Sequence, residues 1–119
     1  MSFIKGRLKS FKYALKGAYI LVTTEHSIMV QLSLGIGVTG LGFYYQVSKL
    51  DWIAQALTIG MVLCAEGLNS AIEGICDFVH PDHHEKIGKI KDIAAGAVTF
   101  TAIAALVVFC IIYTPYFCA

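Results

Sequence analysis

Charged residues are scarce in this sequence of 119 residues. Only 14% of the chain is Asp, Glu, Lys or Arg, whereas 57% is hydrophobic. A water-soluble domain usually carries about 25% charged residues to cover its surface. The length allows one domain at most. A small soluble bundle of helices is therefore the weaker alternative to an all-α membrane protein.

Several familiar sequence signals are also missing. No GxxxxGK[ST] loop and no kinase-type glycine loop occurs, so the two common soluble ways of binding ATP are excluded. The first twenty residues are basic throughout and lack a separate apolar core with a small-residue cleavage site, so no cleaved signal peptide is expected. The four cysteines show no paired spacing, and three of them fall within apolar runs. We interpret them as small apolar residues rather than as a disulfide framework or metal site.

Long uncharged runs are what the sequence does contain. Residues 28–47 and 93–113 carry no charge, and each run reaches the roughly 20 residues that a bilayer-crossing helix needs. A third run begins at Trp52 and becomes long enough only if the helix continues through Val79. We therefore predict a single domain, residues 1–119, with transmembrane helices at residues 28–47, 52–79 and 92–113.

The basic residues are distributed unevenly along the chain. Of nine Lys and Arg residues, five precede the first span, three lie between the second and third, and only Lys49 lies between the first and second. Three spans place the N-terminus and the second loop on the same side, so eight of the nine basic residues share a side. The positive-inside rule assigns that side to the cytoplasm.

The N-terminal segment, residues 1–22, has the pattern of an amphipathic surface helix. Its apolar residues recur at helical spacing, and its lysines form a second stripe about a quarter turn away. Such a helix lies in the headgroup layer, with its lysines near lipid phosphates. Two roles stay open: an anchor that fixes topology, or part of the wall of a site at the cytoplasmic surface.

Polar residues gather in the second half of the second span, in the stretch AEGLNSAIEGICD. On a helix they fall within an arc of about 100°, and they are Glu66, Asn69, Ser70, Glu73 and Asp77. A carboxylate in hydrocarbon is costly, so these groups must face protein, water or a cation. The predicted topology places Asp77 at the cytoplasmic surface and Glu66 roughly 16 Å deeper. The polar face therefore descends from the cytoplasm into the membrane.

This arrangement suits phosphoryl transfer to a lipid. Glu25 precedes the first span on the same side, and Lys91 begins the third. Carboxylates from two helices near a lysine suit a divalent cation chelated by nucleotide phosphates, because Mg²⁺ typically takes one or two carboxylates plus phosphate oxygens. The deeper Glu66 is placed to accept a proton from a lipid alcohol. From spacing alone, a non-enzymatic protein that conducts protons or cations is an equal alternative, and a structural subunit that uses the acids for helix pairing is another.

The segment EGLNSAIE, residues 66–73, followed by Asp77, resembles the signature ExxNSAIExxxD of the small prokaryotic integral-membrane lipid kinases. That family includes diacylglycerol kinase and undecaprenol kinase. The resemblance covers nearly the whole chain, since Lys16-Gly17, Glu25 and Lys91-Asp92 lie at suitable distances. It implies ATP-dependent phosphorylation of the hydroxyl of diacylglycerol or undecaprenol. It also implies a homotrimer with shared sites, in the bacterial cytoplasmic (inner) membrane with the active site facing the cytoplasm, and no nucleic-acid partner.

The resemblance implies a role for each matching residue. Glu66 corresponds to the general base, and Glu25 and Glu73 correspond to the ligands of Mg²⁺ in the metal–ATP complex. The positions implied to contact or orient the nucleotide, besides these two acids, are Tyr13, Asn69, Asp82, His84, Lys91 and Asp92, with His83 in the same loop.

The sequence departs from the family pattern at two places. Met29 stands four residues after Glu25, where the family often carries a basic residue, so a contact near the headgroup is missing. The loop HPDHHEK holds three histidines, and a Zn²⁺ site there is the alternative to a polar interfacial loop. The segment AAGAV after Asp92 is more similar to the undecaprenol kinase branch, but it does not decide between the two lipids.

Overall fold

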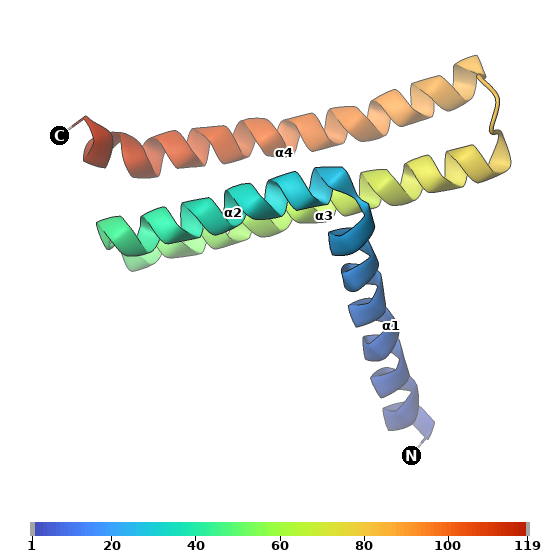
Figure 1. Ribbon diagram of the computed structural model, residues 1–119, viewed down its shortest axis with the longest axis horizontal. Helices are drawn as coiled ribbons and strands as arrows, with labels where there is room; N and C mark the ends of the chain where they lie inside the picture. The colour runs from blue at the N-terminus through green and yellow to red at the C-terminus, as the bar shows by residue number, and fades with distance from the viewer. Residues whose placement is uncertain (1, 119) are drawn as a thin grey trace.

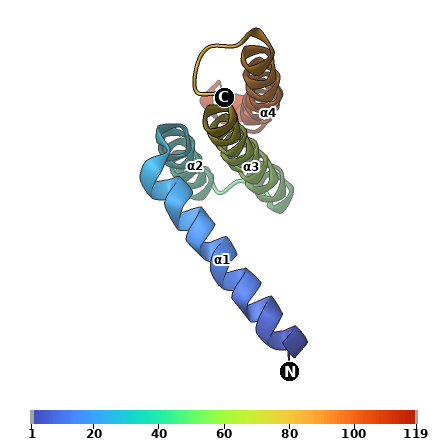
Figure 2. The same ribbon diagram turned by 90° about the vertical axis from the view of Figure 1, so that its right-hand side faces the viewer.

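Four helices make up the described part of the chain, residues 2–118 of the computed structural model. They are α1 (Ser2–Thr24), α2 (His26–Tyr45), α3 (Lys49–Val79) and α4 (Glu85–Phe117). Helices α2, α3 and α4 run alongside one another, whereas α1 leaves this bundle sideways (Figures 1 and 2). The prediction of an all-α protein with three long apolar helices and a separate N-terminal helix is confirmed.

Helices α2, α3 and α4 are each long and apolar enough to cross a membrane. Helices α3 and α4 extend further than their predicted spans, whereas α2 begins and ends two residues earlier than its span. The largest difference is at α4, which begins at Glu85 rather than at residue 92. Charge-free runs mark only the part of a helix that lies in hydrocarbon, whereas hydrogen bonding continues the helix into water. The charged residues between Glu85 and Asp92 therefore belong to the helix.

Local capping explains where the chain reverses direction. Gln46 ends α2 in the left-handed region, at φ 51° and ψ 53°. The Val47 N–H group donates to the Gly42 carbonyl at 3.2 Å, which is the hydrogen bond of a Schellman motif. Ser48 then begins α3, because its side-chain oxygen accepts from the Asp51 N–H group at 3.1 Å. Three residues, 46–48, thus form a closed turn between two antiparallel helices.

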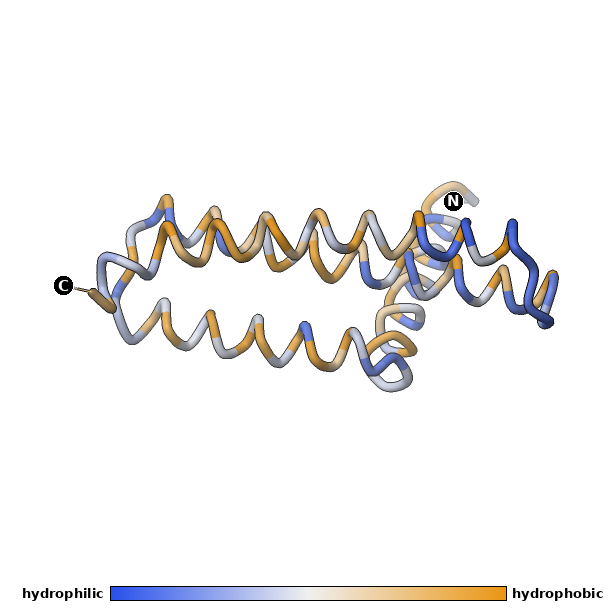
Figure 3. Tube along the Cα trace, turned by 90° about the horizontal axis from the view of Figure 1, so that it is seen from above, coloured by the Kyte–Doolittle hydropathy of each residue, from blue (hydrophilic) through white to orange (hydrophobic). Residues whose placement is uncertain are grey.

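The unequal lengths of the helices position the polar end of the molecule. Helix α2 has 20 residues and α3 has 31, which correspond to about 30 Å and 46 Å. The two helices meet at the turn after Tyr45, so α3 and the start of α4 extend well beyond the start of α2 (Figure 1). Since the hydrocarbon layer is about 30 Å thick, this extension reaches the aqueous side. Hydrophilic residues are concentrated at that end, and hydrophobic ones along the bundle (Figure 3).

Aromatic side chains fill the opposite end of the bundle. Tyr113 is fully buried, and its ring lies 4.9 Å from Phe109 and 5.9 Å from Phe117 between centroids. Its hydroxyl oxygen lies 2.8 Å from Gln55 Oε1 and 3.1 Å from Val38 O, so its single hydrogen can be donated to either acceptor. This contact ties α2, α3 and α4 together. Aromatic residues at this level are typical of a membrane–water interface.

Candidate functional site

Glu66 is the buried acid of the polar face of α3. Only 9% of its surface is exposed, and it is one of two buried polar residues in the described chain, with Gln55. It lies seventeen residues after Lys49, the start of α3, or about 25 Å along the helix. If Lys49 marks the outer edge of a hydrocarbon layer about 30 Å thick, Glu66 lies just inside the opposite edge. That is the depth at which the headgroup of a lipid begins. On this basis Asp77 lies beyond the hydrocarbon layer, which differs from the sequence expectation of Glu66 roughly 16 Å below the surface.

The end of α1 packs against α3 next to this acid. Gly67 is buried, and a Cβ atom at its position would lie 3.1 Å from Cδ1 of Leu21. Glycine at this point therefore lets α1 approach α3 closely. The bend that brings α1 there is a single extended residue, Glu25, at φ −98° and ψ 114°. Glu25 is half-buried at this bend.

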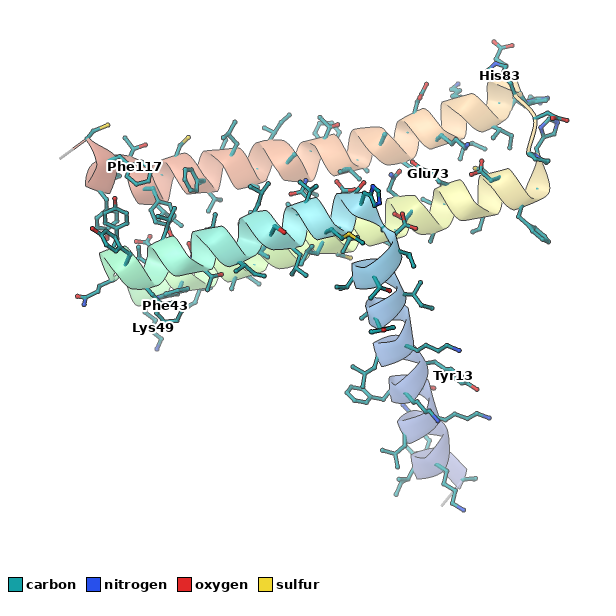
Figure 4. All side chains as sticks on the ribbon, viewed as in Figure 1. Tyr13, Phe43, Lys49, Glu73, His83 and Phe117 are labelled. Carbon is teal, nitrogen blue, oxygen red and sulfur yellow. The ribbon has the colours of Figure 1, made fainter. Side chains whose placement is uncertain are left out.

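Glu73 lies two helical turns beyond Glu66, on the part of α3 that extends past α2 (Figure 4). Its side chain is exposed, and Nδ2 of Asn69 donates to its Oε1 at 3.1 Å. The spacing of four residues puts the two side chains on the same face. Asn69 thus orients one carboxylate oxygen of Glu73, and the other oxygen has no partner in residues 2–118.

An ion pair links α3 to α4 one turn further on. Nζ of Lys91 lies 2.6 Å from Oδ1 of Asp77, and it is the single ion pair within residues 2–118. Lys91 also lines a pocket of about 280 Å³ at the turn between the two helices. The remaining residues around this pocket are His80, Pro81, Asp82, His83, His84, Ile87 and Gly88.

Hydrogen bonds shape the loop around this pocket. Nδ1 of His80 lies 2.7 Å from the carbonyl oxygen of Asp82. Nδ1 of His84 accepts from the Lys86 N–H group at 3.1 Å and so caps the start of α4. The ring centroids of His80 and His84 are 5.0 Å apart, and the ring planes are inclined at 68° in an edge-on arrangement. The loop is therefore a defined structure that brings Asp82, His84 and Lys91 together at one pocket.

The structure does not bring all predicted site residues together in one chain. Tyr13 is exposed on α1 and lies well away from Glu73 and His83 (Figure 4). Asp92 is exposed beside Lys91 on α4, outside the residues that line the loop pocket. A larger pocket of about 410 Å³ lies between α2, α3 and α4, and none of the predicted site residues line it.

Metal-binding side chains do not form a cage in residues 2–118, where no group of three His, Cys, Asp or Glu gathers. The alternative of a Zn²⁺ site at His80, His83 and His84 gains no support from this geometry. Magnesium needs fewer protein ligands, because it usually takes one or two carboxylates and completes its shell with phosphate oxygens and water. The free oxygen of Glu73 fits that chemistry, and the second carboxylate that the resemblance implies is Glu25, half-buried at the bend before α2.

Sequence reasoning proposes the acids and Lys91 as site residues, which stays a prediction, and it missed two contacts among these residues. The hydrogen bond from Asn69 to Glu73 could have been expected from their spacing of four residues. The ion pair of Asp77 with Lys91 joins residues 14 apart across a loop. Opposite charges that flank a short helix–helix connection were the available signal, and only the folded hairpin shows which two of them meet.

Known proteins resemble this chain over most of its length. The model of a family described as prokaryotic diacylglycerol kinase matches residues 12–113. The undecaprenol kinase of Bacillus subtilis (strain 168) is 32% identical over 107 residues, which cover 90% of this chain and 87% of that protein. The diacylglycerol kinase of Synechocystis sp. is 32% identical over 102 residues, or 85% of this chain and 58% of that protein.

A further relative is similar over a shorter stretch. The diacylglycerol kinase of Escherichia coli (strain K12) is 35% identical over 71 residues, which are 57% of this chain and 58% of that protein. The match to the family includes the polar face of α3, the loop pocket and Lys91. By sequence, this chain belongs to the prokaryotic diacylglycerol kinase family.

Proposed function

We propose that this protein is a membrane lipid kinase that transfers the γ-phosphoryl group of ATP to the hydroxyl of diacylglycerol or undecaprenol. Membership of the family and the names of the relatives support the activity and both lipids. The observation that carries the proposal is the burial of Glu66 on the polar face of α3. We infer that this acid lies at the inner edge of the membrane. A base at this depth meets the hydroxyl of a lipid that stays in its leaflet.

Glu66 accepts the proton of the lipid hydroxyl as the hydroxyl oxygen attacks the γ-phosphorus of ATP. A bond forms between that oxygen and phosphorus, the bond from phosphorus to the β,γ-bridging oxygen breaks, and ADP leaves with the electron pair. Lys91 offsets negative charge on the phosphate oxygens from its place at the loop pocket. Burial around Glu66 keeps water from competing as the acceptor.

Glu25 and Glu73 would hold the divalent ion that accompanies ATP, with Mg²⁺ as the proposed metal. Asn69 supports this role, because its hydrogen bond fixes the orientation of the Glu73 carboxylate. When it is bound there, the metal neutralises charge on the phosphate oxygens. Asp82 and His84 contact the nucleotide at the loop pocket, and Asp92 contacts the nucleoside.

The protein works as a homotrimer in the bacterial cytoplasmic membrane, with its N-terminus and α3–α4 loop in the cytoplasm. One chain leaves Glu73 exposed and no residue of α1 buried. Further copies would cover these surfaces. Because Tyr13 lies far from its own loop pocket (Figure 4), a neighbouring copy supplies this side chain to the nucleotide.

Reconstituted protein tests the proposal directly. Vesicles that contain diacylglycerol or undecaprenol receive Mg²⁺ and ATP labelled at the γ-phosphate. Labelled lipid phosphate is the expected product, and equal amounts of the two lipids in one bilayer show which is preferred. Folded protein that labels neither lipid would refute the proposal, and an accompanying flux of protons or cations would favour conduction instead.

A further inference from the structure

We propose that Asp77 is a positioning residue, which holds the ammonium group of Lys91 at the loop pocket where it meets the phosphates of the nucleotide. This inference rests on the proposed function, because it needs Lys91 to be a phosphate contact. It adds a role for an acid that the mechanism above leaves unused.

The ion pair of Asp77 and Lys91 is short but open to water. Nζ of Lys91 lies 2.6 Å from Oδ1 of Asp77, while 63% of the Asp77 side chain and 36% of the Lys91 side chain are exposed. Solvent-exposed ion pairs contribute little to the stability of a fold. Other contacts already join α3 to α4, including the hydrogen bond from Tyr113 to Gln55 and the cluster around Tyr113. A role in stability alone therefore does not account for this pair.

The ion pair fixes the position of the Lys91 ammonium group. A lysine side chain has four rotatable bonds, so an unrestrained ammonium group samples many places around its helix. Asp77 approaches from α3, outside the residues that line the pocket, whereas Lys91 is one of those residues. The Asp77 carboxylate thus restrains the Lys91 ammonium group at the edge of the pocket, from a position outside the pocket lining. Restraint before binding lowers the entropy lost when the ligand arrives.

The pair leaves Lys91 able to bind a phosphate at the same time. An ammonium group has three N–H donors, and Asp77 accepts one hydrogen bond from it through Oδ1. Two donors stay available for phosphate oxygens. Gly88 adds room, because a Cβ atom at that pocket position would meet nothing within 4 Å. Asp77 and the nucleotide therefore need not compete for Lys91.

Nucleotide affinity tests this inference apart from lipid phosphorylation. Titration with a fluorescent ATP analogue and Mg²⁺ measures binding to the reconstituted protein without a lipid substrate. Asp77→Asn should weaken nucleotide binding about twofold to fivefold, as expected for an exposed ion pair. The KM for ATP should rise by the same factor, and kcat should stay unchanged. Asp77→Glu keeps the carboxylate and should restore affinity. Glu85→Gln is the matched control, because it removes one exposed negative charge at the same end and should leave affinity unchanged.

A double-mutant cycle shows whether Asp77 acts through Lys91. In a Lys91→Ala background, Asp77→Asn should weaken binding no further. Three results would each overturn the inference. The first is a further loss of affinity when Asp77→Asn is added to Lys91→Ala. The others are wild-type affinity for Asp77→Asn alone and an Asp77→Glu variant that binds as weakly as Asp77→Asn. A change in thermal midpoint with unchanged affinity would assign the pair to stability and also overturn it. Failure of the proposed function looks different, since the wild-type protein would then label no lipid.

Discussion

At the scale of single residues, two acids on one face of α3 have different surroundings. Glu66 is buried, whereas Glu73, seven residues further, is exposed and hydrogen-bonded to Asn69. A carboxylate withdrawn from water is suited to accept a proton from an alcohol in its apolar surroundings. A solvated carboxylate with one free oxygen is suited to bind a cation. The difference in burial therefore supports the proposed division of roles between them.

Replacement of Glu66 by Gln keeps the shape of the side chain and removes the proposed base. We expect kcat for lipid phosphorylation to fall by about 100-fold or more, the usual contribution of a general base, while affinity for the ATP analogue stays the same. Single-turnover assays and nucleotide titration measure the two quantities. Unchanged turnover would remove the role of Glu66 as a base.

Replacement of Glu73 by Gln leaves an oxygen that can still accept from Asn69. The charge on the proposed metal ligand is lost, so the Mg²⁺ concentration for half-maximal activity should rise at least about tenfold. A Mg²⁺ titration at saturating ATP measures the shift, with Glu85→Gln as the control. A titration curve that matches the wild type would count against metal binding at this position.

The sequence singles out the acids of α3 as candidates because charge inside an apolar run has few explanations. The same reasoning could not predict that Tyr13 lies far from the loop pocket of its own chain (Figure 4). The direction of α1 depends on the single bend at Glu25 and on the packing of Leu21 against Gly67. A helical repeat shows which residues share a face, but it carries no information on the angle between α1 and the other helices.

At the scale of helices, the turn between α2 and α3 requires close packing. A Cβ atom at Gly42 would lie 2.7 Å from Cη2 of Trp52 and 2.8 Å from Nε2 of Gln55. Gly40 lies on the same helix, and a Cβ atom there would meet nothing within 4 Å. Glycine-rich runs in a membrane helix indicate close contact, but they do not show which glycine makes it.

Replacement of Gly42 by Ala should therefore destabilise the bundle by about 1–3 kcal/mol, the usual cost of overpacking. Gly40→Ala is the matched control, and it should be neutral or slightly stabilising because alanine favours a helix. Thermal unfolding in detergent measures both. Equal midpoints for the two variants would show that the contact of α2 with Trp52 and Gln55 is looser than the structure indicates.

Deletion of residues 2–20 tests the role of α1, whose exposed apolar side chains and lysines suit the headgroup layer. We expect lipid phosphorylation to fall much more than membrane insertion, because the three spanning helices stay intact. Alkaline extraction of membranes measures insertion. A variant with its four α1 lysines replaced by Gln is the control for charge alone. Normal phosphorylation by the shortened protein would make α1 an anchor only.

At the scale of the whole molecule, charge and chemistry lie at one end. The α3–α4 loop, the ion pair of Lys91 and the start of α4 form the hydrophilic end (Figure 3), and the aromatic cluster around Tyr113 forms the other. The uncharged runs predicted three spans and the lysines predicted their orientation. The sequence could not show how far α4 continues beyond the membrane, because residues 85–91 are too polar to be counted as a span.

Thiol labelling tests this orientation. Cys118 is exposed near the aromatic end, so a membrane-impermeant maleimide should label it in intact cells. A second variant carries His83→Cys and has all four native cysteines, Cys118 included, replaced by Ala. Its single cysteine, at position 83, should react only after the cells are permeabilised. Labelling of position 83 in intact cells would reverse the topology, and with it the side from which ATP must come.

The turn after Tyr45 fixes one end of α3, and seventeen residues separate the start of that helix from Glu66. That fixed distance of about 25 Å sets the depth of Glu66 in the membrane relative to the turn. In a thicker bilayer the proposed base would sink below the ester layer, and in a thinner one it would rise into water, unless the helices tilt or the lipids deform. The host membrane, through the length of its acyl chains, thereby becomes part of the catalytic geometry.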